Sequence, residues 1–253
     1  MGVLRSLLPS AEQGRVVAVR VGLCGFTMSA SEYFETFPVV EVQQTFYEPP
    51  APRTMLRWRE QSPDGFEFTM KAWQLITHRA SSTTYRRLKT VLTPAERETA
   101  GAFQPSPIVM RAWETTRDCA RILRATAVLF QCPASFKPLP ENVDNMRAFF
   151  AAIERPPGLR FLWEPRGKWP DERIADVCAE LELSHVVDPF DRDTVSRGFT
   201  YWRLHGRGSA YRSYTDDELR ELAGRVPASG ETYVMFNNVP RVLDAQRFLR
   251  LAI

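Results

Sequence analysis

The sequence predicts a single-domain α/β protein with a TIM-like (β/α)8 barrel, in which parallel strands alternate with crossover helices. Three observations support this prediction. Eight short apolar runs have the length of strands, and helix-patterned stretches separate them almost from end to end. The chain has 253 residues, which is close to the roughly 250 residues typical of one such barrel. Eight strand–helix units also favour a closed barrel over an open sheet.

Eight segments are expected to form the strands, because each is apolar or alternates with a period of two near turn-forming residues. In chain order they are residues 19–24, 39–44, 66–71, 125–132, 159–164, 185–188, 200–205 and 232–237. The third strand follows the turn at Pro63-Asp64-Gly65, and Pro133 ends the fourth.

Helices are expected between these runs, where apolar residues recur every three or four positions. Such stretches cover residues 109–123, 143–153, 170–181, 215–222 and 240–248. The fourth of them opens with Thr215 and Glu218, the spacing of a capping box. These apolar faces are expected to pack in the core, and we assign no function to them.

Two segments depart from the regular repeat. The interval 72–124 is about twice the usual length between strands and contains several prolines, which indicates an irregular insertion after the third strand. Residues 1–17 precede the first strand and are expected to be a poorly ordered N-terminal extension. The barrel itself is expected to occupy 18–253.

Composition excludes several classes of protein. Hydrophobic residues make up 44% and charged residues 25% of the chain, which is sufficient for a folded core. The net charge of +3 is too small for a strongly nucleic-acid-seeking protein or a polybasic membrane protein. No apolar run approaches 18 residues, so no membrane span is expected. The four cysteines form no C-x-x-C pair, which favours reduced thiols in a cytoplasmic protein.

Polar residues follow or end every predicted strand, and active sites of barrel enzymes lie at the carboxyl ends of the strands. We expect four residues to be catalytic: Glu41, Lys71, Glu164 and His205. Ten more are expected to bind substrate: Gln43, Tyr47, His78, Gln131, Arg166, Asp188, Arg203, Tyr211, Asn237 and Asn238. Burying a cluster of charged groups of this kind would cost free energy of folding unless a ligand compensates it.

General acid–base catalysis is the chemistry that fits these residue types best. Glu41 and Glu164 lie on the second and fifth strands, where two carboxylates could act on opposite sides of a substrate. Lys71 and Arg166 would keep one carboxylate ionised and could neutralise an anionic group. His205 can exchange protons near neutral pH.

The same segments resemble a known family, called DUF72 or YecE-like, in the family's own order. They are VEVQQTFYEPP (40–50), SPDGFEFTMKAWQLITH (62–78), FQCP (130–133), WEPRGKW (163–169), YWRLHGRGSAY (201–211) and MFNN (235–238). The resemblance runs from about residue 19 to 250 and implies a TIM-like barrel of unestablished biochemical function. The chain departs from the family pattern at Gln43, usually Asn, and at Phe26, where Trp is common.

Metal and phosphate chemistry remain alternatives of lower rank. With only three histidines, a His-rich zinc cluster is not expected, and no metal site or cofactor is assigned. A single Mg²⁺ or Mn²⁺ held by Glu41, Glu164 or Asp188 is the alternative. The loop at 206–209 (GRGS), with Arg203, Arg207 and Arg212 nearby, could hold a phosphate through its backbone N–H groups.

The leading interpretation is a cytoplasmic enzyme that hydrolyses or isomerises a small polar substrate. The best candidate substrate is anionic, such as a phosphorylated sugar or a nucleotide-like compound. The alternative is a non-catalytic nucleic-acid-binding module. Its phosphate and stacking contacts would be Arg166, Arg203, Arg207, Tyr47, Trp169 and Tyr211. The sequence does not predict an oligomeric state.

Overall fold

The computed structural model of the chain describes Leu7–Leu8 and residues 17–252. Within these residues, nine strands pair in sequence order, β1 to β9, and β2 also pairs with β9, which closes the sheet. Each of the eight predicted apolar runs supplies one of the strands β2 to β9. The predicted (β/α)8 barrel is therefore confirmed. Apart from Leu7, Leu8 and Val17, the expected extension over 1–17 lies outside the described residues.

The described chain forms two compact units. The terminal unit comprises the described residues up to Glu41, the short segment Pro63–Glu67 and the residues from His185 onward. The central unit comprises Val42–Ser62 and Phe68–Ser184. Each unit contributes strands whose carboxyl ends carry predicted site residues.

Parallel strands form the core of the terminal unit. They are β2 (Val17–Cys24), β3 (Val39–Val42), β7 (Ser184–Val187), β8 (Phe199–Leu204) and β9 (Glu231–Phe236). β2 pairs with β3 and β9, and β8 pairs with β7 and β9, all in parallel. The additional strand β1 (Leu7–Leu8) pairs antiparallel with β2. A two-residue strand has too little pattern for sequence to predict.

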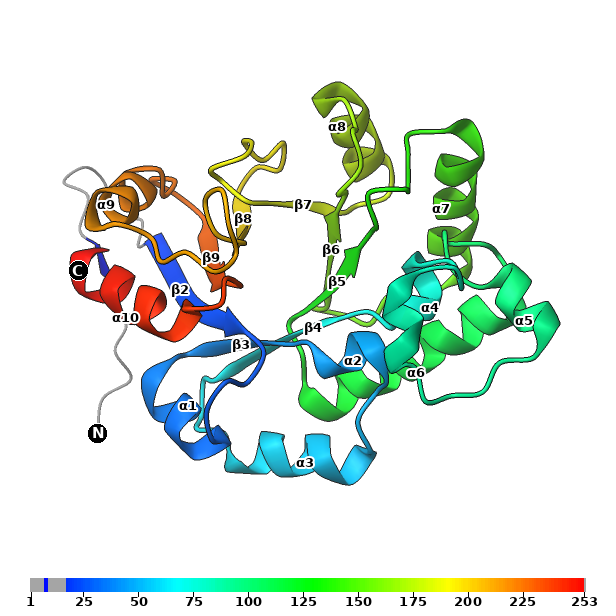
Figure 1. The fold of residues 1–253 in the computed structure, drawn as a ribbon, viewed down its shortest axis with the longest axis horizontal. Coiled ribbons are helices and arrows are strands. Elements are labelled where there is room, and N and C mark those ends of the chain that lie inside the picture. Colours follow the sequence, from blue (N-terminus) through cyan, green and yellow to red (C-terminus); the bar gives the residue numbers. More distant parts are fainter. Residues whose placement is uncertain (1–6, 9–16, 253) are drawn as a thin grey trace. The chain divides into compact units, whose positions relative to one another are not determined.

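Three helices complete the terminal unit: α1 (Ala30–Thr36), α9 (Asp216–Gly224) and α10 (Arg241–Ala252). α9 and α10 lie side by side, and α10 also packs on β2 (orange, red and blue in Figure 1). The predicted capping box is confirmed, because Thr215 and Glu218 bond each other's backbone N–H groups. The short helix α1 was not predicted, although Ser29 caps it by accepting a hydrogen bond from the N–H of Glu32.

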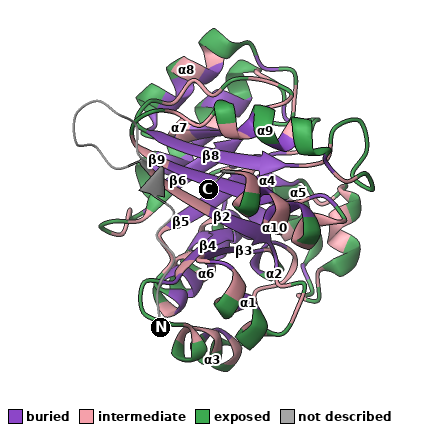
Figure 2. Cartoon of the chain, turned by 90° about the vertical axis from the view of Figure 1, so that its left-hand side faces the viewer, coloured by how far each residue is buried: buried purple, intermediate pink, exposed green. Residues whose placement is uncertain are grey.

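The central unit contains the parallel strands β4 (Glu67–Lys71), β5 (Ala127–Gln131) and β6 (Arg160–Glu164), with β5 between the other two. Its helices are α2 (Gln44–Tyr47), α3 (Pro52–Gln61), α4 (Gln74–Thr77), α5 (Pro94–Thr99), α6 (Pro107–Leu123), α7 (Pro140–Ala152) and α8 (Asp171–Glu180). A 3₁₀ helix, η1, covers Thr83–Arg87. The strands are largely buried, whereas α3, α6, α7 and α8 each have both buried and exposed residues (Figure 2).

Aromatic packing stabilises the central unit. The ring of Phe130 on β5 lies 5.2 Å from that of Phe150 on α7 and 5.4 Å from that of Phe161 on β6. Trp113 of α6 contacts Phe161 edge to face at 5.3 Å. Such pairs add specific geometry to the burial of large apolar surfaces. The amphipathic stretch predicted over 109–123 therefore forms the helix that covers these strands.

The predicted insertion after the third predicted strand is confirmed. It contains α4, η1 and α5 and leads into α6, which is the crossover helix to β5. The segment after α5 folds back on α4, because the N–H groups of Gly101 and Phe103 donate to the carbonyl oxygens of Leu75 and Ile76. Gly101 has φ +81°, and a Cβ there would lie 2.2 Å from the carbonyl of His78. Only glycine fits this close approach.

Candidate functional site at the carboxyl ends of the strands

A buried ion pair lies inside the terminal unit. Arg203 on β8 donates from Nε and Nη2 to the two carboxylate oxygens of Glu41 on β3, both at 3.0 Å. The Tyr201 hydroxyl donates a third hydrogen bond to Glu41 at 3.0 Å. The side chains of Glu41 and Arg203 are 0% and 1% exposed. A pair without water around it needs this bidentate geometry to offset desolvation.

His205 and Asp188 form a second group next to this pair. Asp188 follows β7 and His205 follows β8, and the Asp188 Oδ2 atom lies 3.5 Å from His205 Nδ1. Asp188 is fixed by two backbone donors, the N–H of His205 at 2.8 Å and the N–H of Phe190 at 3.1 Å. The His205 side chain is 25% exposed and that of Asp188 is 7% exposed. An accessible imidazole thus rests on a fixed, largely buried carboxylate.

The contact with Arg203 assigns the neutral tautomer of His205. Arg203 Nη1 lies 3.4 Å from His205 Nε2. A guanidinium can only donate, so Nε2 must be the acceptor and the proton resides on Nδ1, which faces Asp188. His205 therefore presents a basic nitrogen whose orientation is set by Asp188 on one side and by Arg203 on the other.

In the central unit, Glu164 ends β6 and pairs with Arg166. Arg166 Nε donates to Glu164 Oε1 at 2.9 Å, and the side chains of Arg166 and Glu164 are 38% and 7% exposed. Gln131, the last residue of β5, stands opposite Glu164 in the strand register. This carboxylate is therefore buried on a strand, but its cation reaches solvent.

Lys71 and His78 lie close together beside Phe46. The Lys71 ammonium is 3.7 Å from the centre of the Phe46 ring, and the His78 ring contacts the same ring edge to face at 4.9 Å. Both polar side chains are buried. Burial, followed by the charges of Lys71 and Arg166, lowers the pKa of His78 to about 3. His78 is therefore neutral at physiological pH, and the potential around it is positive.

Two other predicted residues of the central unit have different surroundings. The Tyr47 ring is covered by the Arg87 guanidinium at 3.5 Å, and its carbonyl oxygen accepts from Gln74 Nε2 at 2.8 Å. Gln43 precedes α2 and is partly buried. Arg87 and Gln74 were not predicted, because neither lies at the end of a strand.

The predicted residues after β8 and β9 divide into exposed and buried ones. Tyr211 is 82% exposed, whereas Asn237 is partly buried and donates its N–H to the carbonyl oxygen of Leu204. Asn238 is fully buried, and its Nδ2 donates to Asp244 Oδ2 at 2.7 Å and to the Arg212 carbonyl at 3.3 Å. Asn238 therefore connects a loop to α10.

Two of the three arginines near the glycine-rich loop at 206–209, Arg207 and Arg212, are directed towards α9. Arg207 pairs with Glu221 at 3.1 Å and with Glu218 at 3.6 Å, and Arg212 pairs with Glu218 at 3.1 Å. The N–H of Gly206 donates to the Tyr214 hydroxyl. These cations are thus neutralised by carboxylates of α9, which weakens the argument for a phosphate in this loop.

The residues proposed for nucleic-acid contacts are also unequally accessible. Arg203 is buried in its pair with Glu41, and Trp169 is buried with its Nε1 bonded to the Phe136 carbonyl oxygen. Stacking on a base requires an exposed ring. Of these six residues, Tyr211, Arg166 and Arg207 have the most accessible side chains.

The described residues contain no preformed site for the metal ion of the alternative interpretation. Among them, no group of three or more His, Cys, Asp or Glu side chains could hold an ion. Each candidate carboxylate is already bonded to a protein donor, Glu41 to Arg203, Glu164 to Arg166 and Asp188 to two backbone N–H groups.

No helix within residues 17–252 is long and apolar enough to cross a bilayer.

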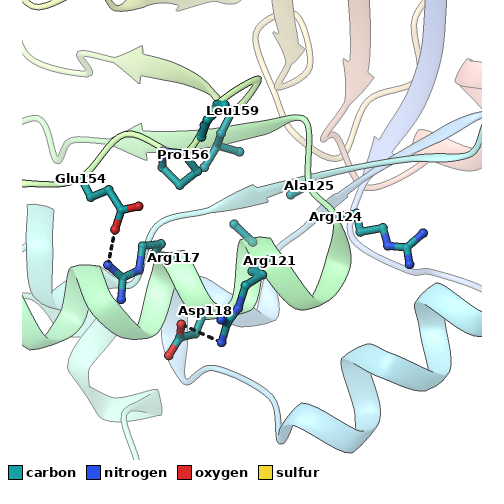
Figure 3. Close-up of a pocket in the computed structure, with 10 residues that line it drawn as sticks. Arg117, Asp118, Arg121, Arg124, Ala125, Glu154, Pro156 and Leu159 are labelled. Carbon is teal, nitrogen blue, oxygen red and sulfur yellow. Dashed lines mark hydrogen bonds and ion pairs between the residues drawn. The ribbon is translucent and has the colours of Figure 1, made fainter.

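A cavity of about 410 Å³ lies elsewhere in the central unit (Figure 3). It is lined by the end of α6 and by the segments that precede β5 and β6, including Ala125 and Leu159. Two ion pairs lie in its lining, Arg117 with Glu154 at 2.7 Å and Arg121 with Asp118 at 3.4 Å. It is thus at the amino ends of these strands, and none of the predicted site residues lines it.

The fold and these polar groups define a parallel α/β barrel with ionisable side chains at the carboxyl ends of its strands. The chain belongs to the DUF72 family, whose model, described as a protein of unknown function, matches residues 28–252. It is also 41% identical over 63 residues to the UPF0759 protein YecE of Escherichia coli K12. That match covers 25% of this chain and only 22% of YecE. The predicted family is therefore confirmed.

Solved structures share the fold. A DUF72 family protein from Enterococcus faecalis V583 superposes with a TM-score of 0.70 at 17% identity, covering 92% of this chain and 95% of its own. A DUF72 family protein from Thermotoga maritima gives 0.65 at 20% identity, with 92% and 98% covered. Endonuclease IV from Thermus thermophilus gives 0.52 at 12% identity, covering 92% of this chain and 97% of its own. A D-psicose 3-epimerase gives 0.52 at 10%, covering 92% and 98%.

Proposed function

We propose that the protein is an enzyme that uses His205 as a general base and acid on a small polar substrate. The observation that carries this proposal is the contact set of His205, with Nδ1 facing Asp188 and Nε2 accepting from Arg203. A partly exposed imidazole backed by a buried carboxylate is the usual arrangement for proton transfer at neutral pH. It follows β8, and in barrels the carboxyl ends of the strands carry catalysis.

In this proposal, the substrate displaces Arg203 Nη1 from His205 Nε2, and the freed lone pair of Nε2 removes a proton from the substrate and later returns it to the substrate or product. Asp188 stabilises the imidazolium formed between these steps, as an orienting carboxylate does in other enzymes. Glu41 was expected to be catalytic, but it is fully buried and accepts hydrogen bonds from Arg203 and Tyr201. We therefore assign Glu41 a positioning role, in which it fixes Arg203 beside His205.

The central unit is proposed, by itself, to bind an anionic ligand. The charges of Lys71 and Arg166 help to lower the pKa of His78 in this unit. A positive potential at strand ends attracts anions such as a phosphorylated sugar or a nucleotide. Hydrolysis and isomerisation both suit acid–base catalysis, and Glu164 stays a second acid–base candidate. The names of two fold neighbours, an endonuclease and an epimerase, belong to these two reaction classes.

A substrate screen with matched variants tests the proposal. Phosphorylated sugars and nucleotides would be incubated with the protein, and conversion followed by ³¹P and ¹H NMR. We expect turnover by the wild type and a loss of about 100-fold or more in His205→Asn and Asp188→Asn. Asp193→Asn is the control, because Asp193 is exposed in the same loop as Asp188. Full activity of His205→Asn on a converted substrate would refute the role of His205.

A second pair of variants tests the anionic group. Arg166→Gln should weaken the binding of an anionic ligand such as inorganic phosphate, whereas Lys168→Gln, which changes an exposed cation on the same loop, should leave that binding unchanged. If no compound is converted and oligonucleotides instead bind with a steep salt dependence, the nucleic-acid-binding alternative is favoured over the enzyme.

A further inference from the structure

Tyr214, in the loop between β8 and α9, contacts the segments that carry both members of the His205–Asp188 pair. We infer that Tyr214, anchored by Asp244 of α10, is a positioning residue that fixes His205 and Asp188 relative to each other. The functional meaning of this inference rests on the proposed role of His205. The inference about geometry can be tested without a substrate.

The first connection leads to His205. The Tyr214 hydroxyl accepts a hydrogen bond at 2.8 Å from the N–H of Gly206, the residue directly after His205. Gly206 has φ +96°, and a Cβ there would lie 2.3 Å from the carbonyl oxygen of Ser209. The turn after His205 is therefore tight enough to require glycine, and the hydroxyl of Tyr214 satisfies its N–H.

The second connection leads to Asp188. The Tyr214 ring stacks on the Phe190 ring, with centroids 5.4 Å apart and planes inclined by 22°. The N–H of Phe190 donates to Asp188 Oδ1 at 3.1 Å, and the Asp188 carbonyl oxygen accepts from the N–H of Asp191 at 3.0 Å. Because Phe190 belongs to the turn that holds the carboxylate, packing against Tyr214 restricts where Asp188 can lie.

Tyr214 itself is held by α10. Its N–H donates to Asp244 Oδ2 at 3.1 Å, and its carbonyl oxygen accepts from Arg247 Nη1 at 2.7 Å. Asp244 is fully buried and also accepts from Asn238 and Arg247. A buried carboxylate with several donors is a rigid anchor, since losing any one donor leaves a desolvated charge.

Tyr214 acts through its neighbours and is not itself a catalytic residue. Its side chain is buried, and burial with the nearby charge of Asp188 raises its pKa, so the hydroxyl remains protonated. A purely structural role would be to close the loop onto α10 for stability. That role predicts an unchanged His205 environment once the protein is folded, whereas a positioning role predicts an altered one.

The sequence provides a clear readout, because the chain contains only three histidines. In ¹³C,¹⁵N-histidine-labelled protein, His205 would be assigned by its loss in His205→Asn. We expect Tyr214→Phe, which keeps the ring and removes the hydroxyl, to change the ratio of the Nδ1–H and Nε2–H tautomers of His205 by about three-fold. Asp188 and Arg203 are among the charged groups that contact His205, so displacement of either changes this equilibrium.

Tyr33→Phe is the matched control. The Tyr33 hydroxyl also accepts from a backbone N–H, that of Leu23, at 2.8 Å, and it is buried in the same unit. We expect Tyr33→Phe to leave the tautomer ratio of His205 unchanged. The His78 signal of the central unit should be identical in both variants and reports that the protein is folded.

A second variant keeps the test decisive if Tyr214→Phe does not fold. Phe190→Leu removes the stacking partner at a partly exposed position and should also move the His205 signal. Unchanged His205 signals in a folded Tyr214→Phe, or in Phe190→Leu if that is the folded variant, would overturn the inference. An active His205→Asn would overturn the proposed function but not this result, so the two failures can be distinguished.

Discussion

Arg203 and Glu41 connect two strands, β8 and β3, that are not neighbours in the sheet. Both side chains are fully buried, and each carboxylate oxygen accepts a hydrogen bond from one nitrogen of the guanidinium. The pair therefore fixes the spacing of two strands from inside the terminal unit. It also determines where Arg203 Nη1 meets His205.

Replacing Glu41 should destabilise the protein strongly. Glu41→Gln removes the negative charge and leaves the Arg203 guanidinium buried without the carboxylate that it binds. Breaking one partner of a buried pair typically costs about 3–5 kcal/mol. We expect this loss in the free energy of unfolding, measured by urea denaturation at pH 7. A loss below about 1 kcal/mol would show that the pair contributes little to stability.

The same change at Glu164 should have a smaller effect. Arg166, its partner, is partly exposed, so water can solvate the guanidinium when the carboxylate is lost. We expect Glu164→Gln to cost about 1 kcal/mol or less in the same denaturation experiment. A loss as large as that of Glu41→Gln would identify Glu164 as structural and remove it from the candidate site.

His78 should make stability fall in acid. Its pKa is about 3 in the folded protein and near 6.5 when unfolded. Below the unfolded value the unfolded chain binds the extra proton, so this contribution is complete above about pH 6.5 and is lost as the pH falls towards 3. The slope from this residue approaches about 1.4 kcal/mol per pH unit. Urea denaturation of the wild type and His78→Gln at pH 7 and pH 5 measures it.

The outcome of the His78 experiment is a difference between two proteins. The wild type should lose more stability than His78→Gln between the two pH values, because only the wild type carries the imidazole. Equal losses would show that His78 ionises normally in the folded state. His205→Gln serves as a reference for replacing a more exposed histidine.

The four cysteines should be unreactive in the native protein. All are buried, and burial raises the pKa of each thiol above its ordinary value. Because the thiolate is the reactive form, a disulfide reagent at pH 8 should label the folded chain very slowly. Four thiols should react rapidly in urea. A fast native reaction at any one position would contradict the packing around it.

Sequence patterns predicted the strands and the longer crossover helices well. Apolar runs such as 232–237 and the stripe beginning at Val109 identify buried elements directly. The predicted ends of the strands differ from the observed ends by at most two residues, since pairing partners rather than composition decide where a ladder stops. The helix α1 was missed because it is short, and α3 was missed because most of its residues are polar.

The site could be predicted in part. Strand ends identified Glu41, Asp188, Arg203 and His205, but not that Glu41 would bind Arg203. That pairing depends on the register of β3 and β8, which are far apart in the sequence. Tyr214 carries no such signal, because its role depends on a stacked ring and on Asp244 from another helix.

The tautomer of His205 is the most direct test of the proposed function. A long-range ¹H–¹⁵N spectrum of histidine-labelled protein at about pH 8.5, two units above the ordinary histidine pKa, separates protonated from unprotonated ring nitrogens. The contacts with Asp188 and Arg203 predict that His205 carries its proton on Nδ1, with Nε2 as the acceptor. We expect this pattern in the wild type and its weakening in Asp188→Asn. A proton on Nε2 in the wild type would contradict the proposed base.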